Sequence, residues 1–497
     1  MIFFKERPVL FLILAAGLLF VFHFLSLPIS PLPWFDETYF ASMAIQFSEN
    51  GEFMAPVGPL IDHYYPQSKA YGPAYFLVLS GMIKAFGFGI SQIRFPALAF
   101  GFLFFGVSFQ IMRKCGISVR LSVAVVFLLL FDPIFLQNIH SARMDSMALF
   151  FTGLGIYFLL NGLKSNALPQ FILCGIAFGI AMLTTPRIAV CLTGPCIVLL
   201  WDFLKKQNLN SFFQGVVVLS FLVFLYSIWV FWGFGGFPEA YQYFFGRPRE
   251  VLLAQNLAGN YIGGNLFIPA FQKPAICLTM ILTFTGFFYS RVRSNPLFLI
   301  CLINIPAFYF LVADTGIYSI LNMPFVYLLM ALCLNEISLP EKFSLHWTLL
   351  PLFLLNFGIF CFKNLIVWTF SNQRDSAVLL EEVKKQIPKD SKVIGDDCYY
   401  YAVKQSGSDF QYLERGSHTP MRWNYHSNIY QYSYIIGQDP SQNPPELLYY
   451  MKNSRLIPVG SIKMKPNSPF GNRLESLLKR FNFRIPQGYK GIIYKRI

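Results

Sequence analysis

Charged residues are scarce in this chain of 497 residues. Asp, Glu, Lys and Arg together make up 13% of it, hydrophobic residues make up 55%, and the mean hydropathy is +0.50. A soluble chain typically carries about 25% charged residues. The composition therefore excludes an ordinary soluble protein and predicts one that crosses a membrane several times, with many of its 56 Phe facing lipid.

Cysteine and histidine lack the patterns of a disulfide or metal framework. Seven of the nine Cys fall inside apolar runs, no CxxC pair occurs, and the six His have no ligand spacing. A disulfide scaffold and a structural zinc site are therefore not expected. An internal repeat is also lacking, which argues against a transporter built from duplicated halves.

Apolar runs that approach the length of about 20 residues needed to cross a bilayer recur through the first three quarters of the chain. The first run follows Lys5-Glu-Arg7 but is not followed by a small-residue cleavage site, so we interpret it as an uncleaved span rather than a signal peptide. We expect eleven spans, near residues 8–27, 94–112, 119–135, 145–161, 170–184, 188–204, 211–232, 269–290, 296–313, 317–335 and 346–368.

Basic residues mark one side of the predicted membrane domain, residues 1–370. They lie in alternate loops, at Lys5, Arg7, Arg113, Lys114, Arg120, Lys164, Lys205, Lys206, Arg291, Arg293 and Lys342. The positive-inside rule makes these loops and the N-terminus cytoplasmic. The run 73–88 is too short to cross and would reverse this charge pattern, so we expect it to be a helix at the outer interface. Residues 28–93 and 233–268 then form two external loops.

The C-terminal region, residues 371–497, is much richer in charge. It holds 19 Lys and Arg against 11 Asp and Glu, and it has no apolar run of spanning length. Strand-like segments occur at Lys392, Tyr432 and Gly491, and helix-like segments occur at Glu381–Ile387 and Arg473–Phe481. We expect a small α/β domain outside the membrane, whose basic character suits anionic lipid or glycan better than nucleic acid.

Carboxylates at two membrane boundaries are the first candidates for a site. Asp36 and Glu37 follow the first span, and Asp145 opens the fourth span beside Arg143. Charges at such boundaries are costly and therefore often functional. The alternative is that Asp36 and Asp145 only cap helices, with Arg143 reaching the interface by its long side chain.

Basic and aromatic residues on the same side are candidates for binding a substrate. Lys69 precedes Pro73, which suits a first helical position, and a lysine beside a helix N-terminus can hold a phosphate. Arg187 and Arg247 are further outer cations. Tyr71 could stack on a sugar ring, although outer tyrosines more often belong to the aromatic belt of the membrane interface.

Four segments in order resemble the GT-C superfamily of membrane glycosyltransferases, which includes protein O-mannosyltransferases and lipid A aminoarabinose transferases. They are Asp36-Glu37, Lys69-Ala-Tyr-Gly-Pro-Ala-Tyr-Phe-Leu77, Ile93-Arg-Phe-Pro-Ala-Leu98 and Ala142-Arg-Met-Asp-Ser146. Two segments depart from the pattern of the family. Leu183-Thr-Thr-Pro-Arg187 has its basic residue displaced, and Ala313-Asp-Thr-Gly-Ile-Tyr318 has none.

The resemblance implies a mainly α-helical GT-C fold in the inner (plasma) membrane and transfer of a sugar from a polyprenyl-phosphate donor to a lipid, glycan or protein. Asp36 would be the base, with Glu37 as the alternative, and Asp145 would orient the acceptor or the first loop. Lys69 would hold the donor phosphate, helped by Arg187 or Arg247. A metal is not required, although adjacent carboxylates could hold one. The other readings are a lipid-linked glycan transporter or scaffold, and an oligosaccharyltransferase or ligase of the same fold.

Overall fold

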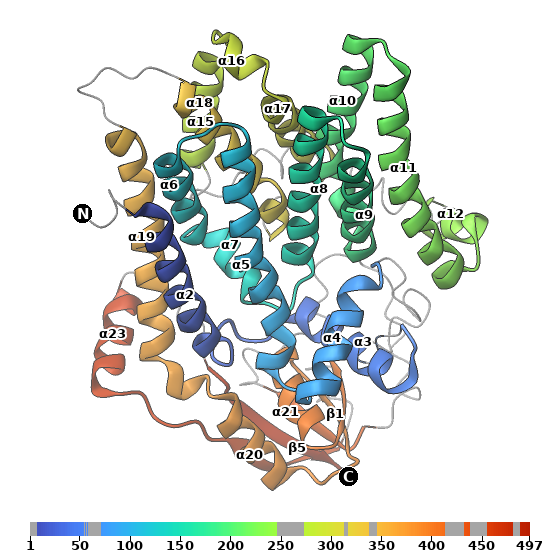
Figure 1. Cartoon of the computed structure of the whole chain (residues 1–497). Coiled ribbons are helices and arrows are strands. Elements are labelled where there is room, and N and C mark those ends of the chain that lie inside the picture. Colours follow the sequence, from blue (N-terminus) through green and yellow to red (C-terminus); the bar gives the residue numbers. More distant parts are fainter. Residues whose placement is uncertain are drawn as a thin grey trace.

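The structure, a computed structural model, describes residues 7–53, 55, 57, 71–245, 273–312, 317–336, 345–412, 432–437, 455–480 and 488–497. Long apolar helices pack into a bundle, and a small sheet with its own helices covers one end of it (Figure 1). The fold is therefore a helical membrane protein with an α/β cap, as expected from the sequence.

Seven helical segments of the described residues are long and apolar enough to cross a membrane. They are α2 (Pro8–Ser26), α5 (Ile90–Lys114), α8 (Asp145–Ser165), η2 (Pro186–Ile188) with α10 (Ala189–Lys206), α11 (Leu209–Trp229) with η3 (Val230–Phe234), most of η5 (Ile317–Leu321) with α18 (Met323–Glu336), and α19 (Leu345–Thr369). The pair α6 (Val119–Leu130) and α7 (Pro133–Ile139) is bent by 63°, and it makes an eighth span if the two helices cross as one.

The remaining three expected spans are helical but short. They are α9 (Leu168–Thr184), α15 (Lys273–Gly286) and α17 (Pro296–Leu311). The count of eleven is therefore not confirmed, although each expected segment contains a helix. The helix α4 (Ala74–Phe86) has 13 residues, too few to cross a bilayer, as predicted for the run 73–88. Two further short helices are α12 (Phe237–Phe245) and α16 (Ser290–Arg293).

A buried polar cluster stabilises the bend between α6 and α7. Asp132 accepts hydrogen bonds from the backbone N–H groups of Ile134 and Phe135 and so caps α7, while Pro133 has no N–H to leave unpaired. Tyr327 of α18 donates its hydroxyl to the same carboxylate at 3.0 Å. The bend brings the end of α7 and the turn after it to the side of the bundle that carries the sheet.

The sheet has the strand order β2-β1-β3-β5-β4. Its strands are β1 (Lys392–Gly395), β2 (Asp409–Tyr412), β3 (Tyr434–Gly437), β4 (Leu456–Ile462) and β5 (Gly491–Arg496). The strand β1 runs parallel to β2 and β3, and β5 pairs antiparallel with β3 and β4. The helices around it are α20 (Ser376–Gln386), η7 (Asp397–Tyr399), α21 (Tyr400–Gln405) and α23 (Pro469–Arg480). All three strand-like segments of the sequence are strands.

The sheet unit shares a hydrophobic core with the first loop of the membrane domain. This core combines α3 (Phe35–Asn50) and α4 with α20, α21 and the inner strands, and it includes Phe40, Phe76, Tyr401 and Ile436. The ring of Tyr401 stacks on Phe88 at 5.4 Å, just before α5. The two predicted units are therefore packed together at the end of the bundle where Asp36 lies.

Candidate active site

One guanidinium joins the two carboxylates singled out by the sequence. Arg143 lies in the turn between α7 and α8, where it donates from Nη1 to Asp36 and from Nε to Asp145 at 2.7 Å. The Asp145 side chain is 1% exposed and that of Asp36 is 22% exposed. Asp36 is therefore the member of this trio that an incoming molecule can reach.

Neither carboxylate caps a helix. The helix α3 begins at Phe35 with Trp34 at its N-cap position, so Asp36 is its second residue. The helix α8 begins at Asp145 itself, after Met144. Neither helix has a side-chain hydrogen bond at its N-cap, so the capping interpretation is wrong for both residues.

The guanidinium of Arg143 keeps its charge in this trio. Burial alone would lower the pKa of Arg143, but the carboxylates of Asp145 and Asp36 raise it, so the guanidinium stays protonated. The same guanidinium lies 5.6 Å from the ring of Trp34. An arginine held on both sides in this way fixes the orientation of both carboxylates.

A second cation lies beside the trio between two tyrosines. Arg187, in η2, has its Cζ 5.4 Å from the ring of Tyr71 and 4.3 Å from the ring of Tyr318, which also lies 5.0 Å from Arg143. Arg187 forms no ion pair with any residue that the structure describes. Arg187 can therefore form an ion pair with an anionic ligand. Burial raises the pKa of Tyr71 to about 12, so its hydroxyl remains protonated.

Gly72 explains how the loop with Tyr71 reaches Arg187. A Cβ atom at Gly72 would lie 1.9 Å from the carbonyl oxygen of Leu183, at the end of α9. Only glycine permits this approach, which brings Tyr71 next to the turn that carries Arg187. The two segments are far apart in the sequence, and the sequence alone gave no sign of this contact.

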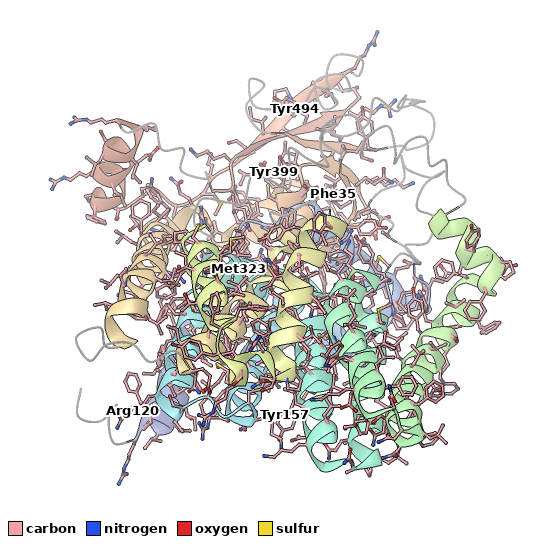
Figure 2. The ribbon with its side chains drawn as sticks, turned by 90° about the horizontal axis from the view of Figure 1, so that it is seen from above. Phe35, Arg120, Tyr157, Met323, Tyr399 and Tyr494 are labelled. Carbon is pink, nitrogen blue, oxygen red and sulfur yellow. The ribbon has the colours of Figure 1, made fainter. Side chains whose placement is uncertain are left out.

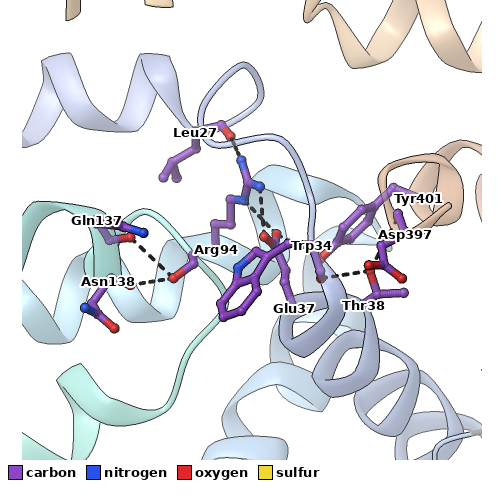
Figure 3. Close-up of polar contacts among 10 residues, drawn as sticks. Leu27, Trp34, Glu37, Thr38, Arg94, Gln137, Asn138, Asp397 and Tyr401 are labelled. Carbon is purple, nitrogen blue, oxygen red and sulfur yellow. Dashed lines mark hydrogen bonds and ion pairs between the residues drawn. The ribbon is translucent and has the colours of Figure 1, made fainter. Parts of the chain in front are cut away.

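Glu37 has different partners from Asp36. Arg94 of α5 donates to its two oxygens at 2.6 and 2.9 Å and also to the carbonyl of Leu27 at 2.5 Å (Figure 3). Tyr401 donates to the same carboxylate at 3.2 Å, and both Glu37 and Arg94 are fully buried. Glu37 therefore ties α3 to α2, α5 and the C-terminal unit and has no free face.

Five of the eight residues singled out by the sequence come together here: Asp36, Tyr71, Arg143, Asp145 and Arg187. Lys69 and Arg247 lie outside the described residues. Trp34 and Tyr318 were missed, whereas Arg94 stood in one of the four segments already noted. An arginine inside an apolar run was the signal for Arg94. No comparable signal existed for Tyr318, because only the lack of a basic residue drew attention to its segment.

Comparison with known proteins shows which proteins this arrangement resembles. Residues 13–244 match the family model of dolichyl-phosphate-mannose-protein mannosyltransferases. ArnT from Cupriavidus metallidurans superposes with a TM-score of 0.60 in its undecaprenyl-phosphate-bound form, at 13% identity over 98% of this chain and 97% of ArnT. The chain therefore has the fold of ArnT, and its first half is similar to the mannosyltransferase family.

Other comparisons agree on this fold. The apo form of ArnT gives a TM-score of 0.62 at 13% identity, over 99% of this chain and 98% of ArnT. A mutant of arabinofuranosyltransferase AftD from mycobacteria gives 0.52 at 14% identity, over 98% of this chain and 41% of AftD. No curated protein sequence matches the chain significantly.

The buried pair of Arg94 and Glu37 generates a first prediction. Arg94→Lys keeps the charge but cannot make the two-pronged contact and reach Leu27 as well, so the free energy of unfolding should fall by about 1–3 kcal/mol. Thermal unfolding of the purified protein measures this. Arg293→Lys, at an exposed position, is the control and should unfold like the wild type. Equal melting temperatures for both variants would contradict a stabilising role for the pair.

Proposed function

We propose that this glycosyltransferase moves a sugar from a polyprenyl-phosphate donor to a hydroxyl of a lipid, glycan or protein acceptor on the outer side of the membrane. The observation that carries the proposal is the trio of Asp36, Arg143 and Asp145 with Arg187 beside it, a cation that has no ion-pair partner among the described residues. A base and a separate anion site are what such a transfer requires.

The proposed reaction is a single displacement. Asp36 accepts the proton of the acceptor hydroxyl while the oxygen of that hydroxyl bonds to C1 of the sugar. The bond from C1 to the phosphate oxygen breaks, and the polyprenyl phosphate leaves with the electron pair. Because attack and departure are in line, the anomeric configuration inverts. Phosphate is a good leaving group, so a strong general acid is unnecessary.

Each cation has a distinct role in this scheme. Arg187, with Lys69 or Arg247 as further candidates, neutralises the charge that grows on the phosphate oxygens. Arg143 orients Asp36, and Asp145 holds Arg143 in place at 2.7 Å. We also propose that the reaction needs no divalent metal, because Arg143 already occupies the position between the two carboxylates.

The direct test is an assay of the purified protein with a panel of polyprenyl-phosphate sugars and a membrane extract as acceptor. Release of polyprenyl phosphate together with labelled product, unaffected by EDTA, supports the proposal. Turnover only with pyrophosphate-linked oligosaccharides would instead place the protein with the oligosaccharyltransferases and ligases. Flipping of a lipid-linked glycan without turnover would identify a transporter.

Replacing Asp36, Asp145 or Glu37 by its amide should have a different effect in each case. Asp36→Asn keeps shape but removes the base, so kcat should fall by about 100-fold or more, while donor KM and melting temperature change little. Asp145→Asn should have a smaller effect on kcat, since its role is to position Arg143. Glu37→Gln should mainly lower stability. Steady-state kinetics with thermal unfolding separates these outcomes, and full turnover by Asp36→Asn would rule out Asp36 as the base.

Removal of the donor-side cations should affect binding rather than the chemical step. Arg187→Met removes a charge-assisted contact to phosphate, so donor KM should rise about tenfold or more. Lys69→Ala should act in the same direction. Lys84→Ala, which removes a lysine from the last turn of α4, is the control and should keep wild-type kinetics. If all three variants gave the same small change, Arg187 and Lys69 would have no specific role at the phosphate.

The orientation in the cell is also proposed: N-terminus in the cytoplasm, and the site and C-terminal unit on the outer side of the inner membrane. In its support, Arg120 of the basic loops lies at the opposite end of the molecule from Tyr399 and Tyr494 (Figure 2). Reporter fusions after Asn372 should be external, and fusions after Lys206 should be cytoplasmic. Fusions after Phe88 and after Arg94 should both be external, and a cytoplasmic signal after Arg94 would overturn this orientation.

A further inference from the structure

The C-terminal unit makes polar contacts with the two residues that directly follow Asp36. The hydroxyl of Tyr401, in α21, donates to Oε1 of Glu37 at 3.2 Å. The hydroxyl of Thr38 donates to the carbonyl of Trp34 at 3.1 Å and also lies 3.4 Å from the main-chain carbonyl oxygen of Asp397 (Figure 3). The first turn of the helix that carries Asp36 is therefore held from outside the membrane domain.

Tyr401 is itself held rigidly. Its ring is buried and stacks on Phe88 with an interplanar angle of 15°. One turn later in the same helix, the side-chain amide of Gln405 donates to the Phe88 carbonyl at 2.8 Å. A phenol fixed in this way can direct its hydroxyl at one acceptor only. That acceptor, Glu37, also accepts two hydrogen bonds from Arg94.

The two donors to Glu37 leave its carboxylate a single orientation. Arg94 attaches it to the membrane bundle, and Tyr401 attaches it to the C-terminal unit. Because Glu37 is bonded to Asp36 through one peptide unit, a fixed Glu37 side chain restricts the backbone that aims the Asp36 carboxylate. Productive attack is sensitive to displacements of about 1 Å at the reacting groups.

We propose that Tyr401 is a positioning residue for the transfer reaction, through which the C-terminal unit completes an active site that otherwise belongs to the membrane domain. The proposal rests on the proposed function, in which Asp36 is the base. Tyr401 does not touch the substrate in this scheme. It acts through Glu37, so its loss should lower kcat and reduce the order of the first turn of α3.

The chain contains a matched control for the test. Tyr400 precedes Tyr401, is equally buried and packs its ring 6.0 Å from Phe88, but its hydroxyl has no hydrogen-bond partner among the described residues. Tyr401→Phe and Tyr400→Phe each remove one buried hydroxyl from the same place. Only the first removes a bond to Glu37.

Two measurements on the full-length purified protein decide the proposal. In Tyr401→Phe, backbone amides of the segment 34–40 should exchange hydrogen faster, and kcat should fall about tenfold with donor KM unchanged. Tyr400→Phe should match the wild type in both. A double variant of Tyr401→Phe with Glu37→Met should be no slower than Glu37→Met alone, because each change removes the hydrogen bond between Tyr401 and residue 37.

The outcomes separate this proposal from the proposed function. Unchanged exchange and unchanged kcat in Tyr401→Phe, or equal effects from Tyr400→Phe, would overturn the positioning role. Additive losses in the double variant would also overturn it. If the wild type uses no polyprenyl-phosphate donor, the proposed function fails. The catalytic role of Tyr401 then fails with it, even if Tyr401→Phe increases hydrogen exchange in the segment 34–40.

Discussion

The sharing of Arg143 between Asp36 and Asp145 is the interaction on which the rest of the site depends. Without it, two carboxylates would face each other in a largely buried place, which is costly because like charges there are poorly screened. With it, a positive charge lies between them and both are oriented. The bend after α6 brings the turn with Arg143 to this end of the bundle, and α3 presents Asp36 to it.

Around this trio, the protein separates the roles that its charged residues play. Asp36 is paired yet partly exposed, as a base that meets a substrate must be. Glu37, its neighbour, is fully buried by Arg94 and Tyr401 and connects the membrane bundle to the sheet unit. Arg187 is stacked between tyrosines and has no acid partner among the described residues, which suits it to an anion brought by the substrate.

The sequence predicted the parts of this arrangement that depend on local pattern. Apolar runs located the helices, and charges at membrane boundaries singled out Asp36, Arg143, Asp145 and Arg187. It could not predict which of two adjacent carboxylates is exposed, because that depends on Arg94 and Tyr401, which arrive from distant segments. Tyr318 was missed for the same reason, and the contact of Gly72 with Leu183 is visible only in three dimensions.

The central claim is the proposed one, that this protein adds one sugar from a polyprenyl-phosphate donor to a surface molecule. Mass spectrometry of the surface glycolipids, glycans and glycoproteins from a strain lacking the chain, compared with its parent, tests this most directly. The account predicts that one class of surface molecule loses the mass of a single sugar residue while the corresponding polyprenyl-phosphate sugar accumulates. Identical surface molecules in both strains, with no accumulated donor, would contradict it.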